Sequence, residues 1–210
     1  MKKFFLILTA MALLVLVSLA ITGCKTAVGL GPELVEFMGS EFEITLPDNW
    51  EGGTKEELDS VAEDLEDLGQ DELAEDVIEN KVYLLFFGYD SEAAAEGGDI
   101  SNLTITGETA GFLSIEEYMD LTYTDLAEKY KEAEYEFNII EQDIVSIGNY
   151  EEVGRTLTRQ EVNGAEVGTA QYIIKNESDF WVLTFTAGQE EFNENIEAFD
   201  EVFKTFKIKD

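Results

Sequence analysis

The fold is decided by the segment of residues 150–175, which reads YEEVGRTLTRQEVNGAEVGTAQYIIK. Polar and apolar side chains alternate on both sides of Asn163-Gly164, and a period of two is typical of a strand with one buried face. Asn-Gly between two such segments is the strongest short signal for a two-residue hairpin turn, because both turn positions require positive φ. The segment therefore predicts two antiparallel strands, at residues 150–162 and 165–175.

More strands are expected before and after this hairpin. Residues 138–147 alternate weakly, and residues 179–187 are rich in aromatic and β-branched side chains, so the last third of the chain is predicted to be a meander. Residues 81–89 are almost continuously apolar, which favours a central strand covered on both faces. Two further alternating strands are predicted at residues 41–46 and 102–106.

Amphipathic helices are expected to cover this sheet. Ser114 and Glu117 match a capping box, which marks the start of the clearest helix. The closing helix carries a single apolar stripe, which is typical of packing on a sheet. The helices are expected at residues 54–68, from residue 71 onward, at 114–132 and at 190–206, with a helical turn at 32–38 and an acidic loop at 90–99. Together with the strands they predict an α+β fold, an antiparallel sheet flanked by helices on both faces.

The N-terminus has the layout of a bacterial lipoprotein leader. Lys2 and Lys3 precede the apolar residues 4–20, and the segment ends in Ile21-Thr22-Gly23-Cys24, which matches a lipobox. The alternative is an uncleaved transmembrane helix, since the apolar run approaches the length of a span; the only cysteine of the chain, placed directly after Thr22-Gly23, favours lipidation. The expected organisation is a signal peptide at 1–23, a lipidated tether at 24–40 and one domain at 41–210.

Composition excludes several functions. The chain has 46 acidic and 13 basic residues, no histidine and one cysteine, with a formal net charge of −33. Nucleic acid would be repelled, and the usual zinc, copper and haem ligand sets are missing. Because the acids are spread along the whole chain, we interpret them as adaptation to a salt-rich habitat; the alternative is a surface that collects Ca²⁺.

The best local cluster of acids for such a cation is Asp90, Glu92, Glu96 and Asp99, around Gly97-Gly98. Carboxylate oxygens are the ligands that Ca²⁺ prefers. The spacing does not match an EF-hand, and a flexible acidic loop is the alternative interpretation. No other cofactor is expected.

A family resemblance covers residues 41–208. An alternating strand ends in Leu46-Pro47-Asp48-Asn49-Trp50, a helix starts Ser-Ile-Glu-Glu-Tyr at Ser114, and a meander leads to a closing helix that ends Phe203-Lys204-Thr205-Phe206. This pattern resembles the PsbP-like fold, which includes DcrB-type lipoproteins. The resemblance implies an antiparallel sheet with helices on both sides; it implies no particular function, because the fold carries unrelated roles.

No reaction is specified by the sequence. It contains no Ser-His or Cys-His set and no phosphate-binding loop. We therefore expect a non-enzymatic, extracytoplasmic lipoprotein, held to the membrane through Cys24, that binds an envelope partner such as a protein. The alternatives are a Ca²⁺- or small-ligand-binding lipoprotein and a carboxylate-based hydrolase. Several aromatic residues are expected either to line a groove or to pack in the core: Trp50, Tyr83, Tyr89, Tyr118, Tyr123 and Trp181.

Overall fold

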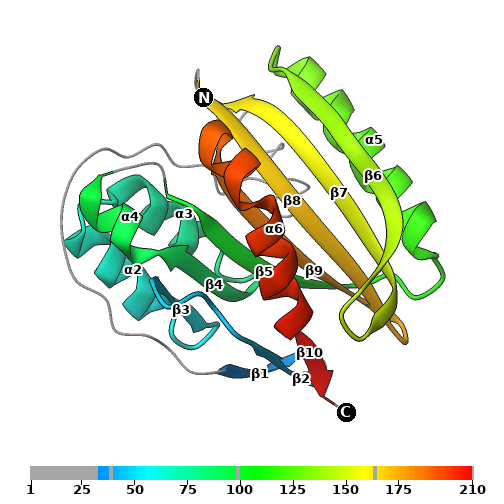
Figure 1. The fold of residues 1–210 in the computed structure, drawn as a ribbon, viewed down its shortest axis with the longest axis horizontal. Helices are drawn as coiled ribbons and strands as arrows, with labels where there is room; N and C mark the ends of the chain where they lie inside the picture. The colour runs from blue at the N-terminus through cyan, green and yellow to red at the C-terminus, as the bar shows by residue number, and fades with distance from the viewer. Residues whose placement is uncertain (1–32, 38–39, 98–99, 163–164, 210) are drawn as a thin grey trace.

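The computed structural model describes residues 33–37, 40–97, 100–162 and 165–209 (Figure 1). The leader, the lipobox and Cys24 lie outside these residues. The described strands form two sheets. The larger runs in the order β3 (Trp50–Thr54), β4 (Leu84–Asp90), β5 (Asn102–Thr109), β9 (Asp179–Gly188), β8 (Ala165–Asn176), β7 (Tyr150–Val162) and β6 (Phe137–Ile147). The smaller contains β1 (Glu33–Phe37), β2 (Ser40–Ile44) and β10 (Lys207–Lys209).

The predicted hairpin of residues 150–162 and 165–175 is confirmed. Val162 pairs with Ala165, so the connection between β7 and β8 has two residues, and the antiparallel register continues to the pair Gly154 and Ile173. Every pairing along the large sheet is antiparallel. The predicted sheet flanked by helices is therefore present.

One face of the large sheet is covered by α6 (Gln189–Thr205) and carries a continuous apolar core. The core combines buried side chains of β2, β3, β4, β5, β7, β8 and β9 with the stripe of α6. Its rings stack closely: the Tyr172 and Phe203 centroids lie 4.5 Å apart, and those of Phe185 and Phe199 4.9 Å apart. The helix approaches the sheet at Gly168, where a Cβ atom would lie 2.1 Å from the ring of Phe192. Glycine is thus required there for packing.

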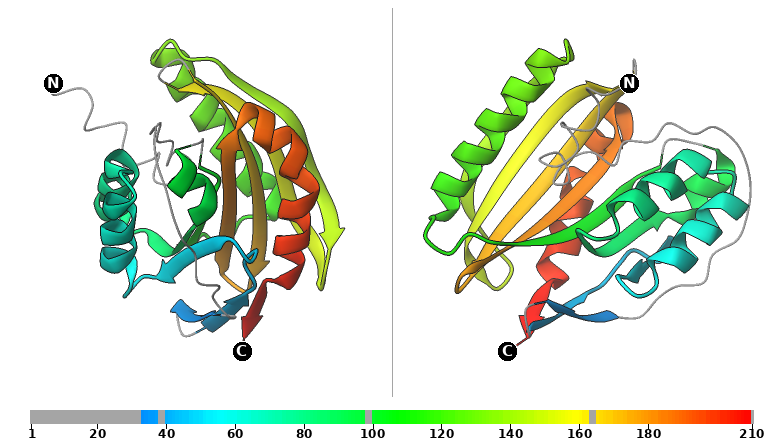
Figure 2. Two further views of the ribbon diagram at one scale, coloured as in Figure 1. Left: turned by 60° about the vertical axis from the view of Figure 1, so that its left-hand side comes forward. Right: turned by 180° about the vertical axis from the view of Figure 1, so that it is seen from behind.

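The opposite face is covered by two separate groups of helices (Figure 2). One group contains α2 (Leu58–Asp67), α3 (Asp71–Asn80) and α4 (Ser91–Glu96), of which α2 and α4 contact β3 and β4. The other is α5 (Ile115–Glu132), which contacts β6, β7 and β8. The capping box at its start is confirmed, because Ser114 Oγ accepts from Glu117 N and Glu117 Oε2 accepts from Ser114 N.

Three local predictions are wrong. Residues 32–38 were expected to make a helical turn, but Glu33–Phe37 is strand β1 and pairs with β2; a neighbouring strand supplies hydrogen bonds that local propensity cannot anticipate. Residues 90–99 were expected to be a loop, but Ser91–Glu96 is helix α4. Strand β3 was not expected at all, because its two glycines resemble a turn.

The start of α2 also differs from the prediction. The helix was expected to open at Thr54, but it begins at Leu58. Glu57 Oε2 accepts hydrogen bonds from both N and Oγ1 of Thr54, each at 3.0 Å. The predicted side-chain contact therefore exists, and it closes the turn between β3 and α2.

Candidate functional site

The exposed rim of the large sheet is the candidate site. Strand β6 is its last strand and pairs with β7 alone among the described residues (Figure 1). Three isoleucines of β6 are exposed: Ile139 by 42%, Ile140 by 49% and Ile144 by 44%. Unpaired strand backbone beside exposed apolar side chains is a template for adding another strand.

Strand β6 also has features that discourage pairing with arbitrary strands. The register with β7 shifts between Ile139 and Glu141 and again between Val145 and Ile147, so irregularities lie at both ends of a short regular segment. Within that segment Asp143 is exposed and Glu141 is partly exposed. Bulges and charges on an edge strand discourage aggregation. With a net charge of −33, the rim disfavours another acidic strand and favours a basic one.

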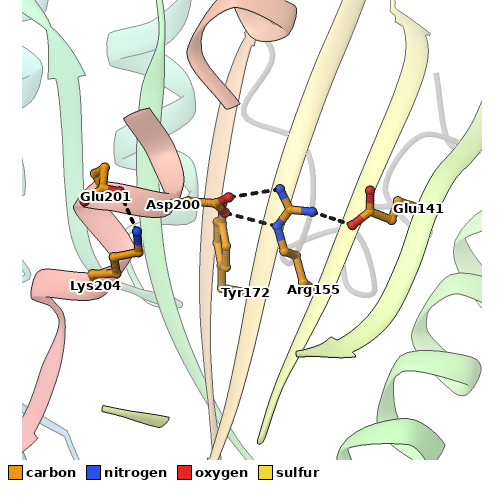
Figure 3. Close-up of polar contacts among 6 residues, drawn as sticks. All are labelled: Glu141, Arg155, Tyr172, Asp200, Glu201 and Lys204. Atoms are coloured by element: carbon orange, nitrogen blue, oxygen red, sulfur yellow. Dashed lines mark hydrogen bonds and ion pairs between the residues drawn. The ribbon is translucent and has the colours of Figure 1, made fainter. Parts of the chain in front are cut away.

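A buried arginine fixes this rim to the rest of the molecule (Figure 3). Arg155 of β7 is only 8% exposed. Its Nη1 donates to Glu141 Oε1 of β6 at 2.5 Å, and its Nε donates to Asp200 Oδ1 of α6 at 3.0 Å. Tyr172 of β8 donates from its hydroxyl to the same Asp200 oxygen at 2.6 Å. The guanidinium therefore connects β6, β7 and α6.

The contacts of this network stabilise a charged Arg155 and a neutral Tyr172. Burial lowers the pKa of Arg155, but the Asp200 carboxylate and the Tyr172 oxygen outweigh burial and raise it above its ordinary value. Burial and the hydrogen bond to Asp200 raise the pKa of Tyr172. Arg155 therefore stays protonated and the Tyr172 hydroxyl stays neutral near neutral pH. The arrangement is a structural tie that offers no free acid or base.

The described residues do not form a cation site from the four acids that the sequence suggests. Both carboxylate oxygens of Asp90 are engaged: Oδ1 accepts from Ala93 N at 2.9 Å as the N-cap of α4, and Oδ2 accepts from Asn49 Nδ2 at 2.7 Å. Glu92 and Glu96 are exposed on α4, and Asp99 lies outside the described residues. Within those residues no group of three or more acids could hold a metal ion. The Ca²⁺ site stays a prediction.

Five of the six aromatic residues that the sequence singles out pack in the core, which is one of the two alternatives stated for them, and they line no groove. Only Tyr83 is exposed, by 47%. The others are at most 6% exposed and belong to the core: Trp50, Tyr89, Tyr118, Tyr123 and Trp181. Each of these rings belongs to one of the apolar clusters, so these rings serve packing.

A cavity of about 600 Å³ lies at the end of the sheet where α5 begins, lined in part by Tyr150, Glu152, Lys175 and Glu177. Lys175 Nζ already donates to two backbone carbonyls, at 2.5 Å to Leu113 and 3.2 Å to Gly111. The lysine thus closes the turn before α5, and the remaining lining acids are exposed surface charges. The cavity holds no obvious catalytic pair.

Sequence reasoning missed the rim. The weak alternation of residues 138–147 predicts a strand, but strand order is set by pairing between distant segments. The one local signal was the run of isoleucines beside acids, which a fully covered strand would not carry.

Comparison with known proteins identifies the fold. No family model matches the chain, and no curated protein matches it in sequence. Cyanobacterial PsbP (CyanoP) from Synechocystis sp. PCC 6803 is similar in structure, with a TM-score of 0.51 at 11% identity over 89% of this chain and 98% of that one. LpqN of Mycobacterium tuberculosis, described as involved in cell envelope biogenesis, gives 0.46 at 10% identity over 86% and 91%.

A further similar structure is PA94, a protein of unknown function from Pseudomonas aeruginosa, with a TM-score of 0.42 at 11% identity over 83% of this chain and 94% of that one. The likeness to CyanoP confirms the PsbP-like fold that the sequence resembles. At this identity the likeness concerns the fold alone, and the function has to be argued from the chain's own residues.

Proposed function

We propose that this protein is a non-enzymatic, lipid-anchored envelope protein whose PsbP-like domain binds a protein partner along β6. The observation that carries the proposal is the row of exposed isoleucines on an edge strand that Arg155 connects to α6. A rigid edge costs less ordering on binding than a mobile one.

The partner is expected to add a strand that alternates apolar and basic side chains. The backbone of β6 supplies hydrogen bonds, and Ile140 and Ile144 supply apolar contact. Asp143 and the partly exposed Glu141 favour lysine or arginine opposite them. A second copy of this chain would bring the same negative charge to the rim, so a different protein fits better.

The anchor rests on the leader and lipobox, Ile21-Thr22-Gly23-Cys24. A diacylglyceryl group supplies the two acyl chains that stable anchoring needs. Within the described part of the chain, no helix combines the length and apolar composition that a membrane crossing requires. Mass spectrometry of the N-terminal peptide tests this: we expect a lipid adduct on Cys24 that the Cys24→Ala variant lacks. An unmodified Cys24 in membrane-derived protein would contradict it.

The non-enzymatic assignment is supported by the residue inventory. The chain has no histidine, and its single cysteine is assigned to the anchor. Among the described acids, Asp76 has its pKa raised to about 6, by burial and by Glu79, Glu72 and Glu75 of the same helix. It does not line the cavity. Burial and the neighbouring acids of the same helix explain its raised pKa without a catalytic partner.

A photo-crosslinker tests the binding edge. We would place a photoreactive amino acid at Ile140 of the full chain and, as a matched control, at Val82. Each variant would be crosslinked in the membranes of the organism that produces the protein. Val82 is 62% exposed and precedes β4, away from β6. We expect a discrete protein adduct from position 140 only, weakened by high salt.

Two outcomes would contradict the proposed edge. Identical adducts from positions 140 and 82 would indicate a non-specific surface. An adduct that persists after Asp143→Lys and Ile144→Lys are introduced beside the crosslinker would show that neither the apolar nor the acidic character of β6 selects the partner.

A further inference from the structure

The turn of residues 110–113, which precedes α5, holds one large apolar side chain out in solvent. Phe112 is 88% exposed, more than any other large apolar side chain of the described residues. Its neighbours Ala110 and Leu113 pack against the cluster beneath α5. The same turn therefore buries two apolar side chains and leaves the largest one outside. A single exposed apolar side chain is ordinary; the way this turn is held and its place in the molecule are not.

The turn is fixed by contacts on both sides of the phenylalanine. Lys175 Nζ donates to the carbonyl oxygen of Gly111 at 3.2 Å and to that of Leu113 at 2.5 Å. Gly111 also packs so closely on the connection between β8 and β9 that an added Cβ atom would lie 2.8 Å from the Cβ of Ser178. The backbone of the turn is therefore held against the sheet, and Phe112 is presented from a fixed base.

This turn lies at the same end of the molecule as the small sheet. Ser114 and Asn149 line the same cavity, so the start of α5 lies beside the connection between β6 and β7. That connection also contacts β10, because the hydroxyl of Tyr150 accepts from Ile208 N at 3.1 Å. Strand β10 belongs to the small sheet, which Figure 1 shows at the lower end of the molecule, near the connection between β6 and β7.

The proposed anchor also reaches the domain at this end. Strand β1 begins at Glu33 and pairs with β2, which pairs with β10. Glu33 lies nine residues after Cys24, and a fully extended segment of that length spans at most about 30 Å. A tether this short limits how the anchored domain can turn. It brings the end that carries Phe112 within reach of the lipid.

We propose that Phe112 contacts the bilayer surface and sets the orientation of the anchored domain. The proposal rests on the lipid anchor proposed above and adds a second membrane contact to it. The partner is a lipid surface, in which the ring enters the boundary between headgroups and acyl chains, as apolar residues of peripheral anchors do. The acyl chains already hold the protein at the membrane, so the contact is intramolecular and a weak one suffices.

The charges at this end select the kind of lipid surface. Glu151, Glu152 and Glu177 are exposed around the cavity. These carboxylates repel anionic headgroups, so we expect a stronger contact with zwitterionic lipid. Salt screens the repulsion, and the contact with anionic lipid should therefore increase as NaCl is added.

This orientation leaves strand β6 open to its partner. The last residue of β6, Ile147, precedes the connection at the membrane-facing end, whereas its first residue, Phe137, follows the far end of α5. The strand therefore extends away from the membrane, with its unpaired edge accessible along its length.

Tryptophan quenching on the full lipidated chain tests the contact. The reporter is Phe112→Trp, and Tyr135→Trp is the matched control, because Tyr135 is 44% exposed and follows the opposite end of α5. The vesicles are phosphatidylcholine with and without bromine on the acyl chains. The native Trp50 and Trp181 are buried and give both variants the same background. We expect bromine to quench the reporter at 112 and to leave the reporter at 135 at the background level.

The outcomes separate the contact from the anchor. A reporter at 112 quenched no more than the one at 135, in protein that floats with the vesicles, would overturn the contact and leave the anchor intact. Protein that does not float would refute the anchor, and the contact with it. A reporter at 112 that is shielded in native membranes but unquenched in vesicles would overturn the lipid contact in favour of a protein at this turn.

A second reporter separates a contact made by Phe112 from one imposed by the tether. Asn149→Trp places the reporter on the exposed connection between β6 and β7. We expect its quenching to fall when Phe112→Asp is added and to persist with Leu121→Asp, which adds the same charge at an apolar position of α5 that is 60% exposed. Equal quenching in the two variants would show that the tether alone positions this end and that Phe112 takes no part.

Discussion

The two faces of the large sheet come from the same strands but differ in chemistry. On the α6 face, one apolar cluster extends from Phe86 of β4 to Leu157 of β7 without interruption. On the other face, two clusters stand apart. Between them lie eight buried, uncharged polar side chains of β5, β9, β8 and β7, which we call the polar rows: Asn102, Thr104, Thr156, Thr158, Thr169, Gln171, Thr184 and Thr186. Apolar burial is the dominant favourable term in folding. We infer that the α6 face supplies most of the stability, and that the other face gives up part of it where the polar rows interrupt its apolar contacts.

The largest expected effect breaks the continuous face. Phe185→Ala removes a fully buried ring that stacks on Phe199. We expect a loss of about 3–5 kcal/mol in the free energy of unfolding, because a large ring leaves a cavity. Thr184→Ala, its neighbour on the opposite face, is the matched control and should cost only about 1 kcal/mol. Urea unfolding measures both, and equal losses would refute the contrast between the faces.

The second prediction concerns the tie between the α6 face and the rim. Arg155→Met keeps the apolar stem but removes the hydrogen bonds to Glu141 and Asp200. We expect a loss of about 1–3 kcal/mol, at the low end because both carboxylates remain partly exposed. The control is Arg159→Met on the same strand, where the arginine is exposed.

Hydrogen exchange locates the effect. In Arg155→Met the amides of β6 should exchange faster than those of β5, because the rim loses its link to α6. Uniform acceleration across the sheet would show that Arg155 stabilises the whole domain and does not position the edge.

Local sequence signals predicted those features of the fold that depend on residues close together in the chain. The hairpin of β7 and β8, the capping box at Ser114 and the apolar stripe of α6 were all predictable, because each has a signal within a few residues of sequence. Strand β3 was not, since its glycines serve a close approach: a Cβ on Gly52 would lie 2.4 Å from the carbonyl oxygen of Phe87. This close approach exists only once β3 and β4 have paired, so the local sequence does not reveal it.

The candidate sites depend on what covers each face and edge. Alternation predicts which side chains of a strand share a face, but not whether helices cover that face. The alternation around Thr158 and Thr169 therefore does not reveal that both are buried, each only 1% exposed. The exposure of Ile140 likewise follows from the terminal place of β6 in the strand order.

The third prediction tests the hydrogen bond that Tyr123 makes to the polar rows. Tyr123→Phe removes the hydroxyl that donates to Gln171 Oε1 and leaves that buried oxygen without this partner. We expect a loss of about 1–2 kcal/mol. Thermal unfolding measures the change, with Tyr135→Phe, an exposed tyrosine, as control. A variant as stable as the parent would mean that water replaces the hydroxyl freely, and that this part of the face is not dry.

The smallest effect concerns the helices that cover the polar face. Burial, together with repulsion from Glu79, Glu72 and Glu75, raises the pKa of Asp76 to about 6, from 3.8. The folded protein therefore binds this proton more readily than the unfolded chain, so the charge costs stability above about pH 6 and the cost fades as the pH falls toward 4.

We expect Asp76→Asn to stabilise the protein by about 1 kcal/mol at pH 7, since solvent screening reduces the full effect, and to make no difference near pH 4. Thermal unfolding across this pH range measures the change, and added NaCl should shrink it. Asp67→Asn removes the same charge from the exposed surface of α2. If both variants stabilise equally at every pH, the gain comes from net charge alone. A gain confined to Asp76 and to the higher pH would instead show that the cost comes from the partial burial of this carboxylate beside three other acids of α3.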